Sequence, residues 1–256
     1  KEQNDQVVNH LADHKSTLDD HALETLISET ANLIAHQQRE DTSEALASIP
    51  MLAISDIDKK SAFYHIQQQN ITGIPVLAHE QFTNDVVYVN FFFDLQVVPQ
   101  ELIPYTALLS SVIGIMSTKS YAFGDLNKAL NIHTGGFFTS LRTYLVRSAD
   151  ESLTAKFVVT SKVMNYKAGK LFELTEEILN HTLYNDPERL KTVLARHQSQ
   201  IEAQVKGNGD HIASRRLSSY ISNLGAFNEL TGGLTYYWDL TDLLKTFDTA
   251  SDEIIS

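Results

Sequence analysis

The sequence predicts an α+β fold, in which a mainly antiparallel sheet carries helices on one face and follows an α-helical hairpin. Two observations predict it. Helical periodicity dominates residues 1–45 and the chain after Tyr166, whereas runs of β-branched and aromatic residues lie between them. The candidate strands are joined by short turns and the helices come in blocks, which is typical of helices layered on an antiparallel sheet. With 256 residues, 43% of them hydrophobic, the chain can form a substantial core.

Residues 1–45 read as two helices that form an antiparallel hairpin. The longer helix repeats apolar residues at helical spacing, and its stripe is Leu23, Leu26, Ile27, Ala31 and Ile34. Ser16 or Thr17 can cap its beginning. Asp19 and Asp20 suit the positive end of the helix dipole.

A connector stopped by Pro50 follows this hairpin, and it predicts a division into two parts. Residues 1–48 form a helical linker arm, and residues 49–256 form the α+β domain. The arm differs in charge from the rest, because residues 1–50 hold ten acidic side chains against three basic ones.

Four strands are expected in one sheet, near residues 74–80, 85–95, 137–147 and 152–164. A turn at residues 83–85 separates the first two. The segment "RSAD", residues 147–150, reads as the hairpin turn between the last two.

Helices are expected between and after the strands. Pro99 opens one that packs on the sheet, and Gly135-Gly136 ends another. Three amphipathic segments follow, at 167–184, 186–207 and 209–221. Asp186 as the cap and Pro187 at the first helical position mark the second of these.

The composition disfavours several function classes. The chain carries 32 acidic and 20 basic side chains, a net charge of −12 without a basic stripe, so no nucleic-acid partner is expected. No apolar run is long enough to span a bilayer, so no membrane partner is expected either. Cysteine is absent, which excludes disulfides and thiolate chemistry and is compatible with the expected cytoplasmic location.

The segment "HLADH" places His10 and His14 on one face of a helix, with Asp13 between them. It differs by one methylene group from H-x-x-E-H, the motif of inverted zinc peptidases. Such a site needs a third protein ligand and a buried surrounding, and the sequence offers neither. We therefore expect no catalytic residue and no metal site, with His10 and His14 as a weak metal-binding pair at most.

Two other short motifs can be explained by structure alone. Gly135-Gly136 could cradle an anion, but a helix C-cap leading into a strand is the favoured interpretation. Arg215-Arg216 could bind an acidic group, but intramolecular pairing is favoured in an acidic helical region.

Three stretches occur in one order along the chain: "EALASIPMLAISDIDKK", "FTNDVVYVNFFFDLQVVPQELIPYTALLSSVIG" and "LNIHTGGFFTSLRTYL". Together they resemble the pitrilysin/insulinase family of zinc metallopeptidases, in its presequence-protease branch. The resemblance runs from the helical arm to the tail. The stretches are not catalytic motifs.

The resemblance implies a particular place in a larger molecule. In that family, four homologous α+β domains of the metallohydrolase type form two half-shells, joined by a helical linker, that enclose a peptide-degrading chamber. The first domain carries H-x-x-E-H and a distal Glu ligand. This chain resembles the linker hairpin and the third domain, so it carries over no catalytic or substrate-binding residue. The implied partners are other domains of the same parent chain and peptide substrates, and the zinc belongs to the parent enzyme.

Two other functions remain open. The chain could be a complete non-catalytic partner subunit, or a protein-interaction module with no link to proteolysis. The start at Lys1 instead of Met favours an excised piece of a longer chain. In that interpretation the chain itself is inactive and its parent is a zinc metalloendopeptidase.

Overall fold

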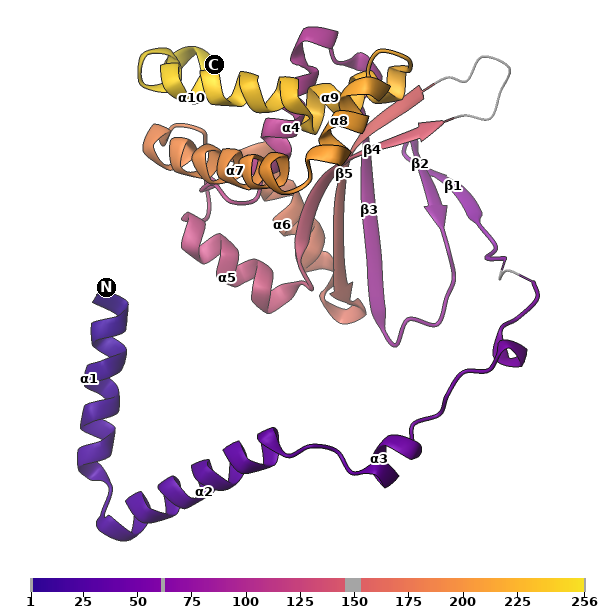
Figure 1. Cartoon of the computed structure of the whole chain (residues 1–256). Coiled ribbons are helices and arrows are strands. Elements are labelled where there is room, and N and C mark those ends of the chain that lie inside the picture. Colours follow the sequence, from indigo (N-terminus) through magenta and orange to yellow (C-terminus); the bar gives the residue numbers. More distant parts are fainter. Residues whose placement is uncertain (1, 61–62, 146–152, 256) are drawn as a thin grey trace. The chain divides into compact units, whose positions relative to one another are not determined.

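A three-stranded antiparallel sheet carries the larger part of the fold (Figure 1). The structure is a computed structural model and describes residues 2–60, 63–145 and 153–255. The sheet consists of β3 (Val86–Asp94), β4 (Phe137–Leu145) and β5 (Leu153–Met164), in the order β3-β5-β4. The α+β prediction with antiparallel strands is confirmed.

The central strand β5 is hydrophobic on both faces because it is covered on both. Val158 and Val159 are fully buried although they point to opposite faces of the sheet. The register places Phe92 of β3 and Ser140 of β4 on either side of Val158. The flanking strands β3 and β4 alternate between half-buried and exposed residues, as strands with one solvated face do.

Seven α-helices accompany this sheet in the described part of residues 80–256: α4 (Ile103–Val112), α5 (Phe123–His133), α6 (Ala168–His181), α7 (Pro187–Gly207), α8 (Gly209–Ser218), α9 (Asn223–Gly232) and α10 (Leu234–Ile255). One core cluster joins the sheet to α5 and α6 through Val159, Leu126 and Leu174. A second joins α4, α7 and α10 through Val112, Leu194 and other side chains.

Residues 1–79 form a separate compact unit, and residues 80–256 form the other. The first unit contains α1 (Glu2–Thr17), α2 (Asp20–Gln38), α3 (Ser43–Ala47), β1 (Gln67–Ile71) and β2 (Ile74–Ala78). The sequence-based boundary after residue 48 is a different division and stays a prediction. Among the described residues, no helix combines the length and the apolar character needed to cross a membrane.

One strand prediction is wrong in its pairing. The strand expected near 74–80 is β2, but it pairs with β1 in a two-stranded sheet of its own instead of joining the main sheet. The turn between them explains this: Thr72 and Gly73 both have positive φ, and the Asn70 side chain accepts a hydrogen bond from the Gly73 N–H at 2.9 Å. Such a two-residue turn closes a local hairpin. The turn at 83–85 exists, but the strands on its two sides do not pair with each other.

Two helix starts also differ from the predictions. Asp19 caps α2, accepting a hydrogen bond from Ala22 N–H at 2.7 Å, while Ser16 and Thr17 bond to carbonyls in the last turn of α1. Pro99 precedes only a short 3₁₀ helix, and α4 begins at Ile103.

The start of α4 at Ile103 follows from Pro104. A proline lacks the N–H that an inner helical turn needs, so it is accommodated only in a first turn. The prediction for α7 is confirmed, because the Asp186 side chain accepts from Arg189 N–H at 3.0 Å and Pro187 is the first helical residue. The predicted "RSAD" turn lies outside the described residues.

Candidate functional site

The two histidines singled out in the sequence lie on α1, and both are exposed. Within residues 2–60, 63–145 and 153–255, no group of three or more His, Asp or Glu side chains is arranged to hold a metal ion. The structure therefore brings no third ligand to His10 and His14. Their metal affinity stays a prediction.

One face of the main sheet presents aromatic side chains to solvent within its own unit. Tyr88 and Phe92 on β3, and Phe138 and Tyr144 on β4, are between 43% and 63% exposed. Residues two apart on a strand share a face, so each pair lies on one side of the sheet. Phe92 and Tyr144 lie across β5 from each other, with ring centroids 6.4 Å apart. We call these four side chains the aromatic face.

Polar groups lie between these rings. Thr160 Oγ1 on β5 donates to Asn90 Oδ1 at 2.7 Å and accepts from Arg142 Nη2 at 3.3 Å. At the end of the same face, Lys156 pairs with Asp94 at 2.9 Å. This side of the sheet thus combines apolar rings with hydrogen-bonding groups, which suits contact with extended chains of mixed composition.

A cavity of about 430 Å³ lies among α4, β4, α7, α8 and α9. Its charged lining is basic, with Arg196 from α7 and Arg215 from α8, and His197 adds an imidazole. No Asp or Glu is among the described residues that line it. In a chain with a net charge of −12, this is a local reversal of sign. We call it the basic cavity.

The histidine of the basic cavity is held against a buried tyrosine. The His197 ring is tilted against the Tyr236 ring, and His197 Nε2 lies 3.0 Å from Tyr236 Oη. Burial lowers the pKa of His197, and burial raises the pKa of Tyr236 above its usual range. Both groups are therefore neutral at pH 7, and the two arginines carry the positive charge of the cavity.

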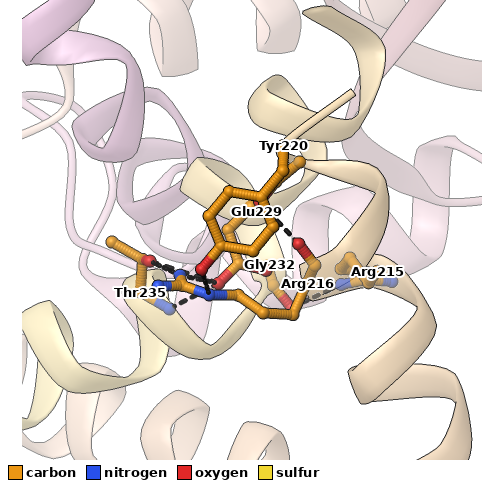
Figure 2. Close-up of polar contacts among 7 residues, drawn as sticks. Arg215, Arg216, Tyr220, Glu229, Gly232 and Thr235 are labelled. Carbon is orange, nitrogen blue, oxygen red and sulfur yellow. Dashed lines mark hydrogen bonds and ion pairs between the residues drawn. The ribbon is translucent and has the colours of Figure 1, made fainter. Parts of the chain in front are cut away.

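Beside the cavity, Arg216 and Glu229 form an ion pair that joins α8 to α9 (Figure 2). Arg216 Nη1 donates to Glu229 Oε1 at 2.8 Å, and Arg216 Nε donates to Tyr220 Oη at 3.0 Å. The prediction of intramolecular pairing is confirmed for Arg216. Its neighbour Arg215 donates instead to the backbone carbonyl of Gly232 and pairs with no acidic group among the described residues.

Glu229 also organises the start of α10. Its Oε1 accepts from the Thr235 N–H at 3.0 Å and from the Thr235 hydroxyl at 3.1 Å. These bonds satisfy one of the helix N–H groups that otherwise lack a partner. Burial of Glu229 raises its pKa, but the hydrogen bond from Thr235 N–H and the pairing with Arg216 outweigh burial, so the pKa lies below its usual value.

The second carboxylate oxygen of Glu229 is buried and has no hydrogen-bond partner among the described residues. It lies against Gly233, where an added Cβ would come within 2.8 Å of Glu229 Cα and closer still to the carboxylate. Gly233 is therefore required for the close approach of α9 and α10. The Gly232-Gly233 pair was the only local signal for this junction in the sequence.

Sequence reasoning noticed Arg215-Arg216 but missed the basic cavity. The lining residues come from positions 107 to 232, so no short motif contains them. The aromatic face was visible only as strand-forming residues, because the sequence does not say which face the helices cover.

The chain is similar to known proteins over nearly its whole length. The family model for the region associated with peptidases of family M16, subfamily C, matches residues 1–243. "Protein HypA" of Clostridium perfringens is 34% identical over 92% of this chain, and "Presequence protease 1, chloroplastic/mitochondrial" of Arabidopsis thaliana is 31% identical over 91%. "Presequence protease, mitochondrial" of Drosophila melanogaster is 23% identical over 90%. The alignments cover 24%, 22% and 22% of those three proteins, so the chain spans about a quarter of the length of the relatives it matches.

Proposed function

The chain belongs to this peptidase-associated family, and we propose that it is a non-catalytic region of a longer, zinc-dependent peptidase that degrades unfolded peptides. Two of the relatives above are named presequence proteases, which agrees with the resemblance found in the sequence. In this proposal the catalytic zinc and its ligands belong to another region of the parent chain. Residues 80–256 form part of the chamber wall, and residues 1–48 act as the linker arm.

The aromatic face is the observation that carries the wall assignment. Four exposed rings and the Asn90–Thr160–Arg142 hydrogen-bond chain occupy one side of a small sheet. An unfolded peptide offers apolar side chains and unpaired backbone groups together. A surface with both kinds of partner binds such a chain without requiring one sequence, because rings contact many side chains and polar groups pair with any backbone.

The charge of the chain sets a preference among peptides. With a net charge of −12 the surface potential is negative, which attracts basic peptides and raises their local concentration. Screening by salt reduces this attraction, since the Debye length falls to about 8 Å at physiological ionic strength. We therefore expect basic unfolded peptides to bind more tightly than acidic ones of equal length, and the difference to shrink in high salt.

The linker assignment is supported by the apolar residues of the two long helices. Val8 and Leu11 on α1, and Ile27 and Ile34 on α2, are each close to half exposed or more. Apolar stripes at helical spacing normally pack against a partner. We propose that other domains of the parent chain cover these stripes.

Photo-crosslinking tests the wall assignment. The full 256-residue chain is mixed with an unfolded basic peptide that carries a photoreactive group, and mass spectrometry locates the products. We expect cross-links on β3, β4 and β5, and an unchanged peptide mass. Cross-links confined to the helices α5 to α10 would contradict the proposal.

A pair of variants sharpens this test. The double variant Tyr88→Ser and Phe138→Ser removes two rings of the aromatic face, and we expect it to weaken peptide binding about tenfold, or ~1.4 kcal/mol. Tyr105→Ser is the matched control, because Tyr105 is 49% exposed and lies on α4. Equal affinity of the two variants would refute a role for the aromatic face.

A further inference from the structure

We propose that the basic cavity binds the C-terminal carboxylate of a peptide, together with the last residue of that peptide. This inference rests on the proposed function for its choice of ligand, since peptides are the proposed substrate of the parent enzyme. It rests on the cavity itself for the chemistry.

The first argument is charge. Arg196 and Arg215 line the cavity, no acidic side chain lines it among the described residues, and the remainder of the chain is strongly acidic. A guanidinium group presents its donors in a planar fork that matches a carboxylate. An isolated basic cavity on an acidic protein therefore concentrates the attraction for an anion at one place.

The second argument is the availability of these donors. Arg196 is exposed and makes no ion pair with the described residues. Arg215 uses Nη1 on the Gly232 carbonyl, which leaves most of its five N–H donors for a ligand. The adjacent Arg216 differs, because Glu229, Thr235 and Tyr220 occupy its donors (Figure 2). The hydrogen bond to Gly232 also holds Arg215 in place before a ligand arrives.

The third argument is size and the remaining lining. About 430 Å³ is within the range of about 300–1,000 Å³ typical of small-ligand sites, and it exceeds what a bare anion requires. Gln200 and Asn228 contribute amide groups that can both donate and accept, as peptide N–H and C=O groups require. Leu141 and Val193 add an apolar wall for a terminal side chain. The lining thus matches a carboxylate that is attached to an amino-acid residue.

The test compares two peptides of one sequence that differ only at the C-terminus, one a free carboxylate and the other a carboxamide. Isothermal titration calorimetry with the full 256-residue chain measures both affinities. We expect the carboxylate to bind at least about tenfold more tightly, as the loss of one charge-assisted pairing implies. Equal affinities would overturn the inference and would leave the aromatic face, and with it the proposed function, untouched.

Two variants connect the preference to the cavity. Arg196→Gln should abolish the preference for the carboxylate, and the fold should be retained because this side chain is exposed. Arg39→Gln is the matched control, since Arg39 is an exposed arginine at the end of α2. A preference that survives in Arg196→Gln, or that disappears in Arg39→Gln, would contradict the assignment. Circular dichroism verifies that both variants are folded.

Inorganic phosphate separates the peptide from a free anion. At constant ionic strength, phosphate should compete with the carboxylate peptide only weakly, because it cannot use Gln200, Asn228 or the apolar wall. Tight phosphate binding without any carboxylate preference would identify a small-anion site and refute the inference. A carboxylate preference in a chain that gives no cross-links on the aromatic face would support the cavity while contradicting the proposed function.

Discussion

Replacing Gly225 by Ala should destabilise the larger unit, because this glycine allows α8 and α9 to approach each other. Gly225 is buried in the first turn of α9. A Cβ built on it would lie 2.8 Å from the backbone nitrogen of Ser219 and closer still to the carbonyl of Ser218. Distances under 3.0 Å are essentially never observed for real Cβ atoms. The atoms in the way belong to the backbone, so no side-chain rotation can relieve the contact.

The magnitude follows from two opposing effects. Overpacking costs about 1–3 kcal/mol and sometimes more, and a backbone obstacle places this site at about 3 kcal/mol. Alanine is a better helix former than glycine by up to about 1 kcal/mol. The net loss of unfolding free energy is therefore about 2 kcal/mol. Since α8 carries Arg215, a shift of this helix should also weaken ligand binding in the basic cavity.

Urea denaturation measures this loss. Trp238 is the only tryptophan and lies on α10, so its fluorescence reports on the larger unit. With a slope of about 2 kcal/mol per molar urea, the midpoint should fall by about 1 M. Gly124→Ala is the matched control: it lies in the first turn of α5 with nothing within 4 Å of an added Cβ, and it should gain about 0.4–1 kcal/mol. A midpoint for Gly225→Ala at or above that of the wild type would refute the steric argument.

Three further results are expected. Glu229→Gln should lower the melting temperature at pH 7; because the pKa of Glu229 is lower folded than unfolded, its stabilisation is present above the unfolded value of about 4.3 and is lost as the pH falls through the folded pKa, so a gap between variant and wild type that does not narrow in acid would contradict the role of this carboxylate. Leu174→Ala removes a side chain that is 1% exposed and should cost about 2–5 kcal/mol in urea, whereas a loss under about 1 kcal/mol would mean that α6 does not pack on the sheet as described. The double variant His10→Ala and His14→Ala should leave the melting temperature unchanged with and without chelator, and mass spectrometry should find well under one zinc per chain after dialysis; a tightly held zinc would establish a true site.

The sequence was sufficient where local signals decide the structure. Asp186 and Pro187 fix the start of α7 because a cap and a proline act within one turn. β-branched and aromatic residues identified β3 and β5 for the same reason. β1 escaped because its residues, Gln67–Ile71, are mostly polar, and only the turn at Thr72 and Gly73 makes them a strand.

The candidate sites could not be found in this way. The basic cavity assembles Arg196 from α7 and Arg215 from α8 with residues of three other elements, and nothing in their sequence positions indicates this proximity. The same holds for Glu229, which reads as an ordinary helical acid but lies buried between Arg216 and the start of α10. Tertiary packing decides which of several similar side chains is buried or left available.

The central claim is that this chain provides a peptide-binding surface and no catalytic centre to a zinc peptidase. One measurement tests it most directly: an unfolded, fluorescently labelled basic peptide is titrated with the 256-residue chain in zinc-containing buffer, anisotropy follows binding, and mass spectrometry of the same samples follows the peptide. We expect saturable binding with the peptide intact throughout. Zinc-dependent cleavage that a chelator abolishes, or a complete lack of binding, would contradict the claim.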